Sequence, residues 1–137
     1  MKEREAIIEI ILGHYPETEG IYLFGSYATD SAWPCSDVDI ALLLPHRKAQ
    51  GQPSLMLTPC HCALADVLGR TVDLINAREV STVLQKEIIA TGLLLYRGDD
   101  EAVGEFEALV LSLYQKLNDE RAAILEAFEK TGRAYAV

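Results

Sequence analysis

The sequence lacks any long apolar run. No segment of this 137-residue chain approaches the ~20 consecutive apolar residues that a membrane-spanning helix needs. Its start, Met1 to Glu5, carries acidic charge, and no small-residue cleavage site follows the isoleucine-rich stretch behind it. We therefore expect neither a signal peptide nor a membrane partner.

Basic residues are scarce. The chain has 12 Lys and Arg against 21 Asp and Glu, a formal net charge of -9, and no Lys/Arg cluster. Proteins that hold DNA or RNA neutralise its phosphates with a basic face. We expect no direct nucleic-acid binding, although the composition is compatible with a small magnesium-bound nucleotide. Acidic charge suits a basic protein partner, but solubility alone also explains it.

Cysteine is also rare. The three cysteines, Cys35, Cys60 and Cys62, are an odd number at uneven spacing, so we expect no disulfide framework and a reducing, cytoplasmic location. Cys60-His61-Cys62 has the composition of a metal site. On a helix, however, these residues face different directions, and no fourth ligand is evident. We do not expect zinc there.

The chain shows no internal repeat, low-complexity tract or linker, and half of its residues are hydrophobic. We expect a single domain over residues 1–137, with a core of about 1–98 and a C-terminal helix at about 100–131. The residues 46–54 are expected to form a loop. Apolar periodicity and breaker residues predict helices at 2–14, 27–31, 58–68, 80–91 and 100–130, and strands at 21–24, 38–44, 71–75 and 93–96.

This order predicts an α/β (α+β) fold, in which helices flank a mixed sheet of about four strands. The continuous apolar character of 38–44 suggests a strand buried on both faces. The last helix would be ~45 Å long, more than a small domain needs. Its apolar stripe could complete the core, dock a partner, or do both.

Two carboxylates open the second predicted strand. Asp37 and Asp39 are separated by one valine, so their side chains point to the same face. Two ionised carboxylates that close repel each other unless a cation lies between them. Hard oxygen ligands that retain some water suit Mg²⁺. Aspartates also form turns at strand starts, so this pair alone is weak evidence.

A third carboxylate strengthens the case. Asp73 lies among apolar residues in Thr71 to Ile75, on a strand expected to be buried, where a charge is costly unless it is paired or binds metal. If that strand lies beside Asp39, the three carboxylates could hold two metal ions ~3.5–4 Å apart, as enzymes of phosphoryl transfer do. The alternative is that Asp73 caps a neighbouring loop.

Gly25-Ser26 follows the first predicted strand and comes ten residues before Asp37. Glycine allows the backbone to approach an anion closely. A helix after it would present free N–H groups and a positive dipole end to phosphate, and serine adds a hydroxyl donor. A Gly-Ser turn alone says little. Its combination with the three aspartates is specific.

This combination resembles the minimal nucleotidyltransferase family of the DNA polymerase β-like superfamily. Gly25-Ser26, Asp37-Val38-Asp39 and Asp73 match the family's motifs, and the resemblance covers about residues 7–97. The compact chain and long final helix are similar to the antitoxins of MNT–HEPN toxin–antitoxin pairs.

The resemblance implies a type VII antitoxin that transfers AMP from ATP to a tyrosine of its cognate HEPN toxin, an RNase, and so silences it. Gly25 and Ser26 would then bind the nucleotide triphosphate. Asp37 and Asp39 would ligate two Mg²⁺ ions, and Asp73 would ligate one of them and help to deprotonate the attacking hydroxyl. A tyrosine, with a pKa near ~10, is a poor nucleophile without such help.

One departure is Asp30, because many family members carry an arginine in the segment after Gly-Ser. Arg47 or Lys48, from the following loop, could then meet the triphosphate charge, although a solvated loop is the ordinary place for both. Two other functions stay open. One is an antitoxin that acts by binding alone, and the other is a nucleotidyltransferase with a small-molecule acceptor.

Overall fold

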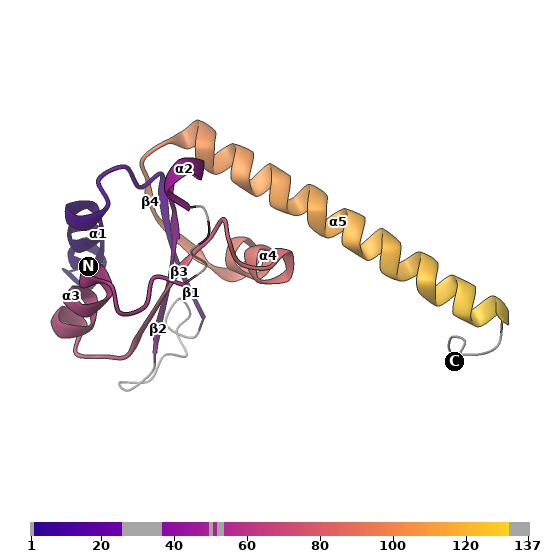
Figure 1. Cartoon of the computed structure of the whole chain (residues 1–137), viewed down its shortest axis with the longest axis horizontal. Helices are drawn as coiled ribbons and strands as arrows, with labels where there is room; N and C mark the ends of the chain where they lie inside the picture. Colours follow the sequence, from indigo (N-terminus) through magenta and orange to yellow (C-terminus); the bar gives the residue numbers. More distant parts are fainter. Residues whose placement is uncertain (1, 26–36, 50, 52–53, 132–137) are drawn as a thin grey trace.

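The computed structural model describes residues 2–25, 37–49, 51 and 54–131 (Figure 1). Within that part of the chain, no helix has the length and apolar character needed to cross a membrane. In chain order the elements are α1 (Lys2–His14), β1 (Gly20–Phe24), β2 (Val38–Leu43), α2 (His46–Ala49), α3 (Pro59–Leu68), β3 (Val72–Asn76), α4 (Thr82–Thr91), β4 (Leu93–Arg97) and α5 (Asp100–Thr131).

The strands form one mixed sheet in the order β3-β2-β1-β4. β1 pairs antiparallel with both β2 and β4, whereas β2 and β3 run parallel. This sheet, its flanking helices and the long last helix confirm the predicted fold class. The parallel pair matters most for function, because β2 and β3 both begin at the same end of the sheet.

Helices cover both faces of the sheet (Figure 1). α1 and α3 cover one face, where Ile40 and Leu42 of β2 are buried, and α4 and α5 cover the other, where Ala41 and Leu43 are buried. Strand β2 lies in the interior of the sheet, and every residue except Asp39 is buried. The predicted two-sided burial of this strand is therefore confirmed.

The helix boundaries follow from local chemistry. The Thr58 side chain accepts the N–H of His61 at 3.2 Å and caps α3, and Gly69 ends that helix in the left-handed conformation. Ser81 caps α4 in the same way. Gly92 ends α4 for another reason, because its φ is -80°. A Cβ there would collide with the Ile88 carbonyl oxygen, so close packing requires the glycine.

Residues 46–54 were expected to be a loop, and this was wrong for their first part. His46–Ala49 forms the short helix α2, in which the Lys48 N–H donates to the Pro45 carbonyl at 2.9 Å. A proline suits the start of a helical turn because its fixed φ matches that conformation. The helix expected at 27–31 lies outside the described residues.

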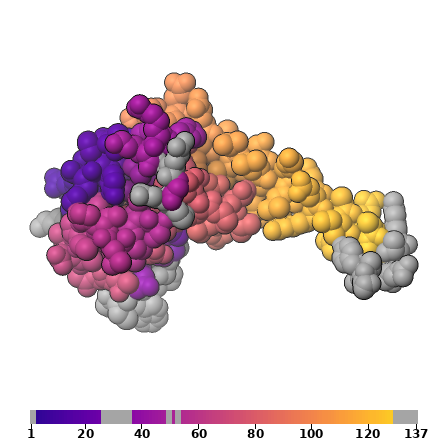
Figure 2. Space-filling model, in the orientation of Figure 1, coloured from indigo at the N-terminus to yellow at the C-terminus, as the bar shows by residue number. Residues whose placement is uncertain are grey.

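Helix α5 is 32 residues long and projects from the body of the molecule (Figures 1 and 2). Val103, Phe106 and Val110 are buried and fix its first turns to the α4 side of the sheet. The ring of Tyr114 lies 5.1 Å from Nζ of Lys86 on α4. Beyond this contact, the described residues of α5 are almost all exposed.

Candidate active site

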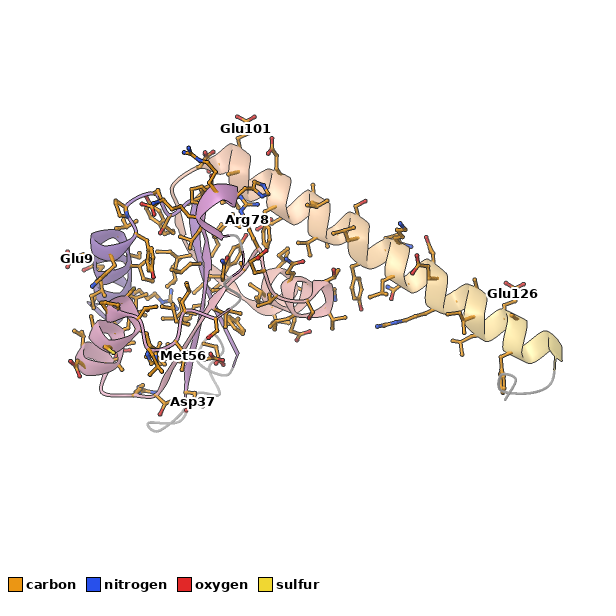
Figure 3. All side chains as sticks on the ribbon, viewed as in Figure 1. Glu9, Asp37, Met56, Arg78, Glu101 and Glu126 are labelled. Atoms are coloured by element: carbon orange, nitrogen blue, oxygen red, sulfur yellow. The ribbon has the colours of Figure 1, made fainter. Side chains whose placement is uncertain are left out.

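Three carboxylates lie at the same end of the sheet. Asp39 and Asp73 are directly opposite each other in the parallel β2–β3 ladder, so their side chains share a face. Asp37 lies two residues before Asp39 and is exposed; it is labelled at the lower end of the sheet in Figure 3. The strands that carry Asp39 and Asp73 are therefore neighbours, as the sequence argument required.

Asp73 differs from expectation in its burial. It is exposed, although its neighbours Val72 and Leu74 are fully buried. It occupies the second position of β3, at the open end of the sheet and on the face opposite to those two residues. Because Asp73 is exposed, its charge pays no desolvation cost that a partner would have to offset. The side chain is therefore accessible to a ligand.

The electrostatics of the site centre on Asp39. Partial burial raises the pKa of its carboxyl group, and the negative charges of Asp73 and Asp37 raise it further. The ionised form of Asp39 is therefore less favourable in the free protein than in a fully solvated, isolated carboxyl group. A divalent cation among these groups would reverse that effect, because it offsets the repulsion.

Gly25 lies against the same carboxylate. It follows β1 directly and has a φ of +72°, in the left-handed region that favours glycine. A Cβ at this position would collide with Oδ2 of Asp39 and would lie 3.1 Å from its Cγ. Phe24, just before it, is the register partner of Asp39. The turn and the carboxylate are thus in contact, which only glycine permits.

Other predicted residues lie elsewhere. Ser26 and Asp30 fall outside the described residues. Arg47 and Lys48 belong to α2, which follows the far end of β2. The four steps from Asp39 to Leu43 alone span ~13 Å of strand. This placement gives no support to the suggestion that these basic side chains meet the triphosphate.

The sequence reasoning missed a function of His61. Its Nδ1 accepts the N–H of Leu57 at 3.1 Å, so its Nε2 carries the proton and donates to the Val72 carbonyl at 2.8 Å. His61 thereby ties α3 to the start of β3, one residue before Asp73. It also holds the exposed Leu57, whose φ is +65°. No sequence pattern marks such a contact.

The neighbouring cysteines take different positions. Cys60 is buried, and its burial raises the pKa of the thiol to about 11, whereas Cys62 is exposed. Cys60 is thus a core residue, Cys62 lies at the surface, and the His61 ring bonds to backbone.

The donor set of the carboxylates fits Mg²⁺, which prefers oxygen ligands and requires few of them from protein. As the side chains stand, no three His, Cys, Asp or Glu residues in the described part of the chain are close enough to hold a metal ion. The shared face, the raised pKa of Asp39 and the space kept by Gly25 are nonetheless what a cation between Asp37, Asp39 and Asp73 would use.

Known proteins resemble this chain in sequence. A model of the polymerase beta nucleotidyltransferase family matches residues 5–101. The chain is 34% identical over 122 residues to the protein adenylyltransferase MntA of Shewanella oneidensis, covering 88% of this chain and 83% of that one.

Solved structures resemble the whole chain. A toxin–antitoxin crystal structure with AMP-PNP contains a chain that is 30% identical, with a TM-score of 0.74, covering 92% of this chain and 98% of that one. A tri-AMPylated Shewanella oneidensis HEPN toxin in complex with its MNT antitoxin matches with 29% identity and a TM-score of 0.69, covering 93% and 97%. Since the family model covers most of the chain and a relative is 34% identical over 88% of it, the chain belongs to the polymerase beta nucleotidyltransferase family.

Proposed function

We propose that this chain is a type VII antitoxin, a protein adenylyltransferase that transfers AMP from ATP to a tyrosine of a cognate HEPN toxin. The relatives support each part. One is named a protein adenylyltransferase, one is crystallised with AMP-PNP, and one is bound to an AMPylated HEPN toxin. Residues 1–137 would act as one nucleotidyltransferase domain.

The reaction is an in-line displacement at the α-phosphorus of ATP. The tyrosine Oη forms a bond to that phosphorus, the bond to the bridging oxygen breaks, and pyrophosphate leaves. The phenolic proton passes to a carboxylate oxygen, for which Asp73 is the candidate because it is exposed and opposite Asp39. The products are AMP-tyrosine and pyrophosphate.

The remaining residues bind and orient. Asp37 and Asp39 would hold Mg²⁺, and Asp73 would share an ion with them. Bound Mg²⁺ supplies charge neutralisation for the phosphates and a lower pKa for the attacking hydroxyl. Gly25 keeps the turn close to Asp39, and Ser26 would add a hydroxyl donor to phosphate.

The observation that carries the proposal is the register of β2 and β3. It sets Asp39 opposite Asp73, and the Gly25 turn packs on the same carboxylate. In the free protein, the burial of Asp39 and the nearby charges make its ionised form less favourable, as the raised pKa shows. A bound cation and triphosphate would offset this cost.

The test is transfer of label. The chain is incubated with α-labelled ATP, Mg²⁺ and the folded HEPN protein encoded beside it, and intact mass is measured. We expect added AMP on the HEPN protein, and none without Mg²⁺ or with Asp39→Asn. An unmodified HEPN protein would contradict the proposal. If Asp39→Asn still protected cells fully, neutralisation by binding alone would be the correct function.

Free thiols at Cys60 and Cys62 support a cytoplasmic location for this activity.

A further inference from the structure

The apolar stripe of α5 continues beyond the part of the helix that packs on the domain. Leu113, Leu117 and Ile124 follow the spacing of the buried Phe106 and Val110, so all five lie on one side of the helix. Ile124 is 53% exposed and its neighbour Leu125 is 62% exposed. The stripe that is core at one end of α5 is therefore without cover at the other.

The uncovered stripe faces the side of the molecule that carries the carboxylates. Phe106 and Val110 point toward α4 and the sheet. The later residues of the stripe lie on the same side of α5 as these two. Glu101 and Glu126 point to the opposite side of α5 (Figure 3). Asp39 has the same parity on β2 as Ala41 and Leu43, which pack on the α4–α5 side. The carboxylates therefore lie on the face of the sheet that α4 and the first turns of α5 cover, and α4 lies between the sheet and the projecting part of α5 (Figure 1).

A cavity lies at the root of this stripe. It has a volume of about 460 Å³ between α4 and α5, and Leu109 and Leu113 form part of its wall. The lining is mixed: Arg78, Gln85 and three further polar residues lie opposite the apolar side chains of α5. A bulky apolar side chain from a partner would find both contact area and hydrogen-bonding groups there.

The size of the free helix argues against a partner that contacts it alone. From Tyr114 to its end α5 extends ~25 Å and, at a diameter of ~10–12 Å, offers on the order of 300 Å². A stable complex buries ~800 Å² per partner. Two copies of this chain paired only through these helices would fall short. A partner that also covers α4 and the catalytic face would not.

Charge restricts the partner further. α5 contains eight acidic and three basic residues. Between Leu117 and Ile124, the exposed Glu120 lies on one margin of the stripe and the exposed Arg121 lies on the other. A helix packed along this stripe needs apolar residues at matching spacing, a basic residue facing Glu120 and an acidic residue facing Arg121.

We propose that the α5 stripe, continued into the cavity beside α4, docks an amphipathic helix of the acceptor protein that carries a basic residue on one margin and an acidic residue on the other. This inference rests on the proposed function for the identity of the acceptor. The docked helix lies along α5, and the body of the acceptor covers the α4 side of the sheet as far as Asp39, where its tyrosine meets the carboxylates.

The test compares two double variants of the full chain. Leu117→Glu with Ile124→Glu places two charges on the stripe, and Gln115→Glu with Ala122→Glu places two charges at the same spacing on the opposite side. Binding of the HEPN protein is measured by calorimetry without ATP. Circular dichroism and binding of Mg²⁺–AMP-PNP report on the fold and the nucleotide site of each variant.

We expect the stripe variant to bind the HEPN protein at least ~30-fold more weakly and the control variant to stay within about 3-fold of the wild type. Equal affinities for both variants would overturn the proposal. So would a wild-type dimer in light scattering that the stripe variant dissociates while HEPN binding is unchanged, because a second copy would then occupy the stripe. Wild type that binds the HEPN protein but transfers no AMP would refute the proposed function and leave the docking surface in place.

Discussion

At Asp39, folding and function make opposite demands. Its carboxyl group is partly buried beside Asp37 and Asp73, which raises its pKa. In the unfolded chain the same group has an ordinary pKa. The ionised form of Asp39 therefore costs folding free energy at neutral pH, and this cost is absent at a pH below its unfolded pKa. Asp39 therefore lowers the stability of the free protein at the position where we propose that a cation binds.

The variant Asp39→Asn separates the two demands. We expect it to lower AMP transfer by ~10²-fold or more, since even indirect partners of a metal cost that much. We also expect a higher Tm than the wild type at pH 7, because the amide carries no charge. That difference should shrink as the pH falls toward the unfolded pKa of Asp39. A variant less stable than the wild type at pH 7 would contradict the assigned direction of the pKa.

Gly25→Ala tests the contact between the turn and Asp39. The positive φ should cost about 1–2 kcal/mol of unfolding free energy. The new methyl group displaces Oδ2 of Asp39, so transfer should fall by more than the stability loss explains. Gly13→Ala is the control: its Cβ would meet nothing within 4 Å, and alanine favours the helix. Urea unfolding and initial rates measure both effects.

At the scale of elements, Arg78 fastens the end of the sheet remote from the carboxylates (Figure 3). Its Nε donates to the Leu44 carbonyl at 2.5 Å, and its Nη2 lies 2.7 Å from Oε1 of Glu19. The guanidinium also lies 5.8 Å from the centre of the Phe106 ring on α5. One side chain thereby connects β2, the segment before β1, and the long helix.

Arg78→Met should lower the unfolding free energy by about 2–4 kcal/mol, because it leaves the Glu19 carboxylate and a carbonyl without their donor. The side chains of this pair are only 9% and 18% exposed. The matched control is Arg97→Met, whose partner Asp100 and own side chain are 79% and 54% exposed; it should change stability by less than ~1 kcal/mol. Equal losses in the two variants, measured in urea, would refute this role of Arg78.

The elements were largely predictable, and their reasons are local. Thr58 before Pro59 marked the start of α3, and apolar periodicity marked α5 almost to its last residue. The aspartate spacing indicated which end of the sheet carries the carboxylates. Contacts between distant segments were not predictable. Nothing local shows that His61 reaches Val72 or that Arg78 reaches Leu44, because those bonds exist only after the sheet has formed.

On the scale of the whole molecule, stability is unevenly distributed. The sheet and the first turns of α5 share buried clusters, whereas the far half of α5 is held by its own backbone hydrogen bonds. A helix without tertiary contacts opens readily in water.

Hydrogen exchange should display this division in the full chain. We expect the amides of residues 117–131 to exchange at least ~10²-fold faster than those of residues 103–114, because their opening does not require the core to open. Bound HEPN protein should slow the exchange of the far segment. The Gln115→Glu, Ala122→Glu variant is the matched control, and bound HEPN protein should slow its exchange as in the wild type. Uniform protection along α5 in the free chain would contradict this view.

The independence of the far half of α5 has an evolutionary consequence. Substitutions there leave the sheet and the carboxylates intact, so this segment can diverge with its partner while the enzyme stays folded. Pairs from different genomic loci should therefore differ most in this segment, and exchanging it between two such chains should exchange the protein that each one recognises.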